Sequence, residues 1–162
     1  MSSDETKGLE ARVQDLEAER EIRNLIATYL LRVDHKDFEG IAGTFAEDGV
    51  MDFGGLVGLG SYKGRKAIAQ VFRDTEGAIP GFSWHLAHTP RIEVHGDKAV
   101  GQWGWTVLGC YPGMEPMEFG GVYDDEYVKT DEGWKIKKKV STAWYAMEFG
   151  KWDNQRFFGP TR

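Results

Sequence analysis

The second half of this sequence consists of strand-type segments separated by short turns. After Gly77 four stretches have the composition of β-strands: about 83–94, 99–110, 118–129 and 134–147. Gly96-Asp97 and Asp131-Glu132-Gly133 are typical of hairpin turns, while Tyr111 to Pro116 forms a longer loop. Strands joined in this way pair with their neighbours along the chain, so this half predicts an antiparallel sheet.

The first half has a helical pattern instead. Apolar residues recur at helical spacing from Gly8 to about Asp34. A second helix is expected to open at Asp37-Phe38, bury Phe45 on its apolar face and end at Asp48-Gly49. The first helix is charge-rich and thinly apolar at its start, so this part is expected to pack on a neighbouring subunit.

A strand, a glycine-rich loop and a third helix complete the first half. Val50 to Phe53 is the predicted strand, residues 54–60 form the loop, and Gly64 leads into the helix. Helices followed by a run of antiparallel strands predict the α+β class. We expect a strongly curved antiparallel or mixed sheet, wrapped around the N-terminal helices as a cone-shaped barrel with a cavity.

Length, charge and cysteine content limit the classes of protein to which this chain can belong. A chain of 162 residues with a net charge of −6 is expected to form one domain and not to bind nucleic acid. The only lysine cluster, at 135 and 137–139, alternates in part with apolar residues, so much of it is expected on the solvent face of a strand. Cys110 is the single cysteine, which excludes an internal disulfide and a cysteine metal cage. With no membrane-length apolar run and no signal peptide before the first helix, we expect a cytoplasmic protein without membrane contact.

One carboxylate and two histidines are the candidates for proton transfer. Asp34 follows Leu30 by one helical turn and therefore continues an apolar face, although it could equally cap the loop to the next helix. His85 and His88 are three residues apart in a predicted strand, so they point to opposite faces and only one can enter a cavity. The same geometry makes them a poor pair of metal ligands.

Aromatic residues are frequent, at 13% of the chain, and can form either core or pocket wall. Trp103 and Trp105 share a face of one predicted strand. The same two possibilities hold for Tyr123, Tyr127, Trp144 and Tyr145. No Gly-x-Ser-x-Gly turn, phosphate-binding loop or dinucleotide fingerprint occurs.

Taken together, these segments resemble the SnoaL-like proteins of the nuclear-transport-factor-2-like superfamily over roughly residues 15–147. Five motifs carry the resemblance: Tyr29-Leu-Leu-Arg-Val-Asp34, the Tyr62-Lys-Gly64 turn, His85-Leu-Ala-His88-Thr-Pro90, Ala99-Val-Gly-Gln-Trp103, and the hairpin Tyr127…Gly133-Trp134-Lys-Ile136. Within the superfamily the pattern is similar to bile-acid 7α-dehydratase and, more distantly, to scytalone dehydratase and hexachlorocyclohexane dehydrochlorinase. The resemblance implies one domain over residues 1–162, with an N-terminal extension at 1–15 and a C-terminal tail or lid at 148–162.

The resemblance also implies a set of roles. Asp34 orients His85, which removes a proton next to an activating group, and Tyr29 hydrogen-bonds the departing or carbonyl oxygen. Lys139 falls where the dehydrochlorinase carries a basic residue. The remaining substrate-binding candidates are His88, Phe53, Trp103, Trp105, Tyr123 and Trp144.

The function implied is that of a lyase without a cofactor or metal. It would eliminate water, or formaldehyde from an aromatic diol, from a small hydroxylated cyclic or aromatic substrate. The resemblance further implies a homo-oligomer, a trimer in preference to a dimer. Two alternatives stay open: an isomerase on the same scaffold, and a non-catalytic binder of an apolar small molecule, because fold alone does not decide function.

Overall fold

The computed structural model describes residues 3–54, 58–78 and 80–148, and backbone only for residues 3–7. The expected tail or lid therefore lies outside the described residues beyond Glu148. The helices are α1 (Ser3–Asp34), α2 (Phe38–Gly43) and α3 (Arg65–Asp74). The strands are β1 (Phe45–Asp52), β2 (Ser61–Lys63), β3 (Phe82–Ala87), β4 (Arg91–His95), β5 (Lys98–Cys110), β6 (Met117–Thr130) and β7 (Gly133–Glu148).

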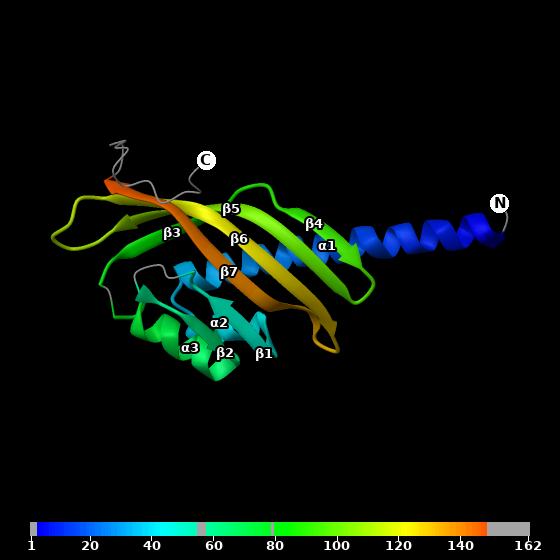
Figure 1. Cartoon of the computed structure of the whole chain (residues 1–162), viewed down its shortest axis with the longest axis horizontal. Coiled ribbons are helices and arrows are strands. Elements are labelled where there is room, and N and C mark those ends of the chain that lie inside the picture. The colour runs from blue at the N-terminus through cyan, green and yellow to red at the C-terminus, as the bar shows by residue number, and fades with distance from the viewer. Residues whose placement is uncertain (1–2, 55–57, 79, 149–162) are drawn as a thin grey trace.

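The seven strands form one mixed sheet that curves over the helices (Figure 1). The strand order is β2-β1-β7-β6-β5-β3, and β4 pairs with the other end of the β5 edge. All pairs are antiparallel except β1 with β7. The α+β prediction is confirmed. The sheet is open, with β2 at one edge, rather than a closed barrel.

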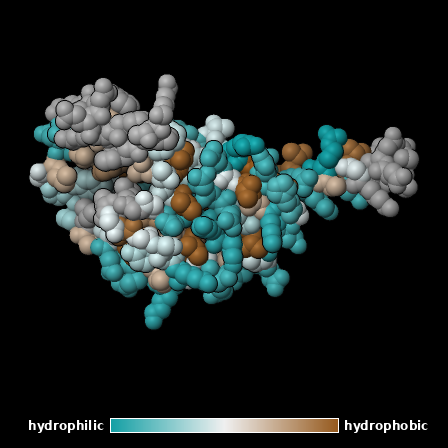
Figure 2. Space-filling view, in the orientation of Figure 1, coloured by the Kyte–Doolittle hydropathy of each residue, from teal (hydrophilic) through white to brown (hydrophobic). Residues whose placement is uncertain are grey.

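Only the C-terminal half of α1 belongs to the core. Ile22, Ile26, Tyr29 and Val33 follow one another at three- and four-residue spacing and are all buried. Residues 8–17 are exposed, and this segment projects beyond the sheet (Figure 1). Its side chains are mostly hydrophilic with scattered hydrophobic ones (Figure 2), which include Leu9, Val13 and Leu16. That this segment packs on a second subunit stays a prediction.

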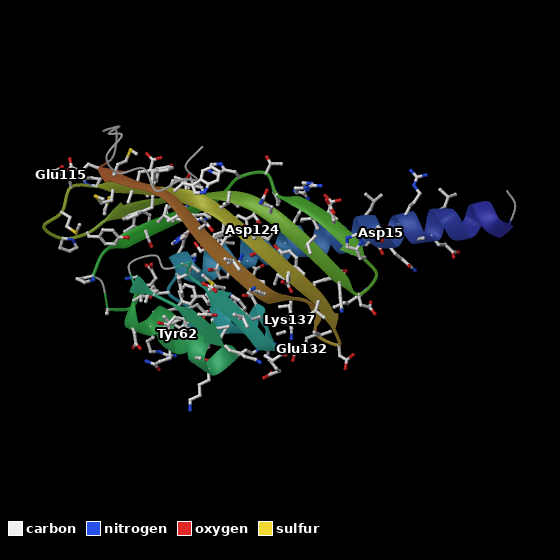
Figure 3. All side chains as sticks on the ribbon, viewed as in Figure 1. Asp15, Tyr62, Glu115, Asp124, Glu132 and Lys137 are labelled. Carbon is white, nitrogen blue, oxygen red and sulfur yellow. The ribbon has the colours of Figure 1, made fainter. Side chains whose placement is uncertain are left out.

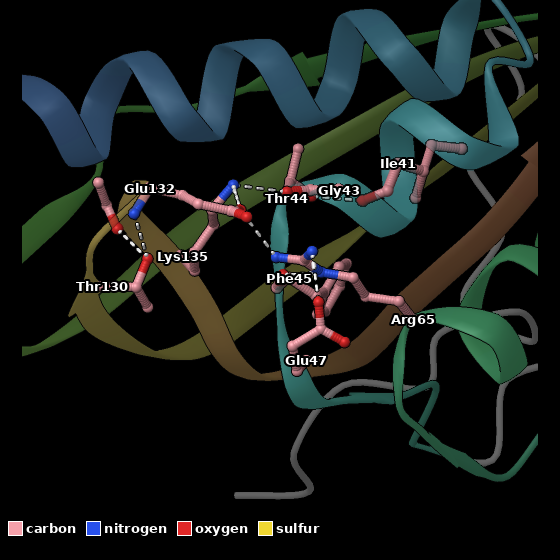
Figure 4. Close-up of polar contacts among 10 residues, drawn as sticks. Ile41, Gly43, Thr44, Phe45, Glu47, Arg65, Thr130, Glu132 and Lys135 are labelled. Atoms are coloured by element: carbon pink, nitrogen blue, oxygen red, sulfur yellow. Dashed lines mark hydrogen bonds and ion pairs between the residues drawn. The ribbon is translucent and has the colours of Figure 1, made fainter.

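The second helix is shorter than the sequence predicts. It ends at Gly43, and Phe45 to Gly49 belongs to β1. Thr44 closes the helix through its hydroxyl, which donates to the Ile41 carbonyl at 2.6 Å (Figure 4). The Thr44 carbonyl then accepts the backbone N–H of Ile136 on β7 at 2.9 Å. A pairing partner ninety residues away thus overrides the local helical pattern.

Arg65, at the start of α3, ties the two halves of the chain together (Figure 4). Its guanidinium donates to the Phe45 carbonyl at 2.8 Å, to Glu47 at 2.8 Å and to Glu132, in the β6–β7 turn, at 3.2 Å. The carboxylates of both partners are largely exposed, so the buried carbonyl is the contact that fixes the helix on β1.

A bulge in β7 changes which residues of that strand face the helices. Trp134 and Ile136 are buried, and after the register shift between Glu126 and Tyr127 the buried residues are Lys139 and Ser141. Lys137, which Figure 3 labels, occupies the irregular position. Its ammonium pairs with Asp48 on the surface. The bulge therefore turns one member of the lysine cluster inward.

None of the helices in the described part of the chain combines the length and apolar character that a membrane crossing requires.

Candidate active site

A cavity of about 530 Å³ lies between the helices and the sheet. Its wall is mostly apolar and aromatic. It is formed by α1, α3, strands β3, β5, β6 and β7, and the segments that follow α3, β1 and β5. Volume and lining are typical of a site for a small organic molecule.

Asp34 and His85 meet at this cavity. Asp34 is the last residue of α1, and one of its carboxylate oxygens accepts twice from His85: from the backbone N–H at 3.0 Å and from ring Nδ1 at 2.7 Å. The side chains are only 13% and 10% exposed, respectively. The helix end is thus joined to β3 by the same oxygen that orients the imidazole.

This geometry determines which ring nitrogen can act as a base. With Nδ1–H donating to the carboxylate, a neutral His85 carries its lone pair on Nε2. Because His85 lines the cavity while Nδ1 is occupied by Asp34, Nε2 is the nitrogen available to a ligand. The negative charge of Asp34 also stabilises the imidazolium that forms when Nε2 takes a proton.

Tyr29 and Tyr123 provide protonated hydroxyl groups on the same cavity. Burial raises the pKa of Tyr29 well above its usual value, and the neighbouring Tyr123 and Asp125 raise it further. Burial is also the main cause of the raised pKa of Tyr123, although a hydrogen bond from Tyr29 lowers it in part. Both phenols therefore remain hydrogen-bond donors at neutral pH.

The other predicted site residues divide into two groups. Phe53, Trp105 and Tyr123 line the cavity. Four predicted residues are not among the lining residues: Trp103, Lys139, His88 and Trp144.

Those four are excluded from the cavity for different reasons. His88 is exposed, and its Nε2 is 2.8 Å from the Thr106 hydroxyl. Trp144 occupies the second irregular position of β7, opposite the Gly120–Gly121 step. Trp103 and Lys139 are fully buried behind the cavity wall.

Lys139 and Asp125 form a buried ion pair that the sequence analysis missed. Lys139 Nζ donates to Asp125 at 2.7 Å, and the same carboxylate oxygen accepts from Trp103 Nε1 and the Tyr127 hydroxyl, at 2.7 and 2.6 Å. The ammonium lies 4.3 to 4.8 Å from the ring centroids of Tyr123, Trp103 and Tyr29. Burial lowers the pKa of Lys139, and Asp125 opposes that shift. The sequence could have indicated that Asp125 is buried, because Asp125 alternates with Tyr123 and Tyr127 along the strand and therefore shares their face.

We expect the buried tyrosines to make the fold sensitive to alkali. Burial raises the pKa of Tyr29, Tyr123 and Tyr127 above the ordinary 10.0. Below pH 10 both the folded and the unfolded chain keep these phenolic protons, so the phenols do not change the free energy of unfolding with pH. Above pH 10 the unfolded chain loses protons that the folded chain keeps, so the free energy of unfolding falls as the pH rises. The three phenols together give a slope of about 4 kcal/mol per pH unit. Urea unfolding at a series of alkaline pH values measures it.

Tyr127→Phe is the control for this slope. This variant lacks one of the three titrating phenols, so the dependence of its unfolding free energy on alkaline pH should be weaker by about a third. This expectation holds whatever the substitution does to stability at neutral pH. An unfolding free energy that stays constant well above the ordinary tyrosine pKa would contradict the prediction.

Among the described residues no group of three His, Cys, Asp or Glu side chains is placed to hold a metal ion.

Comparison with known proteins places this geometry in context. Residues 14–140 match the SnoaL-like domain family. An uncharacterized protein of Mycobacterium tuberculosis strain H37Rv is 28% identical over 142 residues, which cover 80% of this chain and 88% of that protein.

Two solved structures of enzyme-like proteins share the fold. A type 2 hexachlorocyclohexane dehydrochlorinase (LinA) superposes with a TM-score of 0.76 at 23% identity, over 90% of this chain and 95% of that one. A scytalone dehydratase-like protein from Novosphingobium aromaticivorans gives a TM-score of 0.75 at 19% identity, over 91% and 97% of the two chains. At these identities the likeness concerns the fold alone.

Proposed function

This chain belongs to the SnoaL-like domain family, and from that premise we propose that it is a lyase that eliminates a small group from a hydroxylated cyclic or aromatic molecule without a cofactor. The fold is shared with a dehydrochlorinase and a scytalone dehydratase-like protein. The reaction type and its mechanism are argued from the residues of this chain.

The Asp34–His85 pair on an apolar cavity is the observation on which the proposal depends. A base that works at neutral pH needs an unprotonated nitrogen facing the ligand and a partner that stabilises it once protonated. The 2.7 Å contact between Nδ1 and Asp34 supports both requirements. Exclusion of water by the aromatic wall strengthens these electrostatic interactions.

The proposed reaction balances within the site. His85 Nε2 takes the proton from the carbon next to the activating group, and the C–H electron pair forms the new double bond as the C–O bond breaks. The imidazolium then returns its proton to the departing hydroxide, so the products are an alkene and water. The Tyr29 hydroxyl donates to Tyr123 in the free protein, and with substrate bound it redirects this one proton to the oxygen on which charge develops.

Loss of formaldehyde from an aromatic diol uses the same base on a different proton: His85 Nε2 takes the O–H proton of the hydroxymethyl group and the C–C bond breaks to release formaldehyde. The C–C electron pair forms the double bond as the second hydroxyl leaves from the adjacent carbon, and the imidazolium returns its proton to that hydroxide, so the products are formaldehyde, an alkene and water.

Mass-resolved incubation tests this function. Wild type and Asp34→Asn are incubated with hydroxylated steroids, phenylpropane diols and fused-ring phenols, and the products are weighed by mass spectrometry. The proposal expects loss of water or formaldehyde with wild type and not with the variant. A product of unchanged mass but new retention time would identify an isomerase instead. Ligands that bind and are recovered unaltered, with an affinity insensitive to Asp34→Asn, would identify a binding protein.

A further inference from the structure

Glu76 is a carboxylate on the cavity wall that the proposed elimination does not use. It follows α3 by two residues and lines the same cavity as His85. Among the described residues its one side-chain hydrogen bond is accepted from the Ser83 hydroxyl, at a long 3.4 Å. The carboxylate thus retains most of its capacity to accept hydrogen bonds.

The described residues of the cavity wall include acidic groups but neither lysine nor arginine. Its other acidic residue, Asp74, already accepts a hydrogen bond from the Gln70 amide at 2.7 Å. Lys139 contacts the rings of Tyr29 and Tyr123 from behind the aromatic wall, and its ammonium is held by Asp125. A ligand in this cavity therefore meets negative charge that no lysine or arginine from residues 3–54, 58–78 or 80–148 offsets at the wall.

The tyrosines of the wall respond to this charge. Burial is the main cause of the raised pKa of Tyr111, and Glu76 is the next. Glu76 also contributes, more weakly, to the raised pKa of Tyr29 and Tyr123. Since these three phenols also line the cavity, the negative charge of Glu76 acts across it.

We propose that Glu76 is a specificity-determining residue that accepts a hydrogen bond from an amine or hydroxyl group of an aromatic ligand and excludes ligands carrying a carboxylate or phosphate. As a statement about the substrate, this inference rests on the proposed function. A protonated amine is bound most strongly, because it adds charge attraction to the hydrogen bond and contacts aromatic faces favourably.

The separation of Glu76 from the base suits a single substituted ring. Ser83, which contacts Glu76, and His85 are two residues apart on one face of β3, a spacing of roughly 7 Å. A ring with its reacting group at His85 can therefore present its opposite substituent to Glu76.

Calorimetric titration of three para-substituted phenols tests the inference without turnover. The probes are tyramine, its neutral analogue para-ethylphenol and its acidic analogue para-hydroxyphenylpropionate, at neutral pH. Wild type should bind tyramine at least about tenfold more tightly than the acid, with the neutral phenol between them. Glu76→Gln, which keeps the shape and the bond from Ser83, should bring amine and acid within about threefold of each other.

Asp48→Asn is the control. It removes one negative charge from a surface carboxylate that pairs with Lys137 and does not line the cavity, and it should preserve the wild-type preference. Equal loss of affinity for tyramine and ethylphenol in Glu76→Gln would show that a hydroxyl donor is recognised as strongly as an amine.

Three outcomes overturn the inference: the acid binds wild type as tightly as the amine, the preference survives Glu76→Gln, or none of the probes binds. Each is separate from failure of the proposed function, because a protein that eliminates nothing can still show the binding preference. Conversely, elimination from an acidic substrate would confirm the lyase and refute the role of Glu76.

Discussion

Asp34→Asn and His85→Ala are each expected to lower turnover by at least about a hundredfold, the lower end of the contribution of a general base. His85→Ala removes the base itself. Asp34→Asn leaves the imidazolium without its stabilising charge, and the amide can donate to Nδ1 and so favour the wrong tautomer. Initial rates on whichever substrate the mass-resolved incubation identifies provide the measurement.

Two matched variants separate this role from general damage to the protein. His88→Ala removes the exposed histidine that follows β3, and Asp48→Asn removes a carboxylate paired with Lys137 on the surface. Both should turn over substrate at close to the wild-type rate. If either Asp34→Asn or His85→Ala retained such a rate, the pair would not be the base.

Lys139→Met is expected to cost about 3–5 kcal/mol of unfolding free energy. Asp125 and Lys139 are both completely buried, so removal of the ammonium leaves a carboxylate with hydrogen bonds from Trp103 and Tyr127 but no opposite charge. The ammonium also contacts three ring faces of the cavity wall. Urea unfolding at neutral pH measures the loss.

Lys138 is the adjacent lysine and is exposed. The variant Lys138→Met should change the unfolding free energy by no more than about 0.5 kcal/mol. A double variant, Lys139→Met with Asp125→Leu, replaces the pair by apolar groups and should recover much of the loss, because the buried charge is then gone. A similar, small effect of Lys138→Met and Lys139→Met would show that the buried pair contributes little.

The predictable parts of this fold are those that local patterns determine. Helical spacing in α1 and α3 and the turn residues between the long strands were sufficient for the α+β class. The predicted strand at 83–94 proved to be two, because β3 ends at Ala87 and β4 begins at Arg91. The second helix was overextended, since Phe45 pairs with Ile136 on a distant strand that no local window contains.

In the candidate site, too, some residues could be placed from local sequence patterns and others could not. Strict alternation along β3 predicts that His85 and His88 face opposite sides, and the structure places only His85 on the cavity. In β7 alternation fails, because the bulge moves the inward position from Ile136 to Lys139 by an odd step. Glu76 lies beyond a helix end where no periodicity applies, so only the three-dimensional structure brings it to the cavity.

One carboxylate oxygen of Asp34 accepts both hydrogen bonds from His85, and this has a consequence for the evolution of the chain. A carbonyl oxygen at that position can still accept the backbone N–H of His85, so asparagine preserves the tie between α1 and β3 while removing the charge needed for proton transfer. A single amide-for-acid replacement would therefore separate the scaffold from the proposed chemistry. Along such a lineage the proposed catalyst would become a receptor for the same molecule, without an unfolded intermediate.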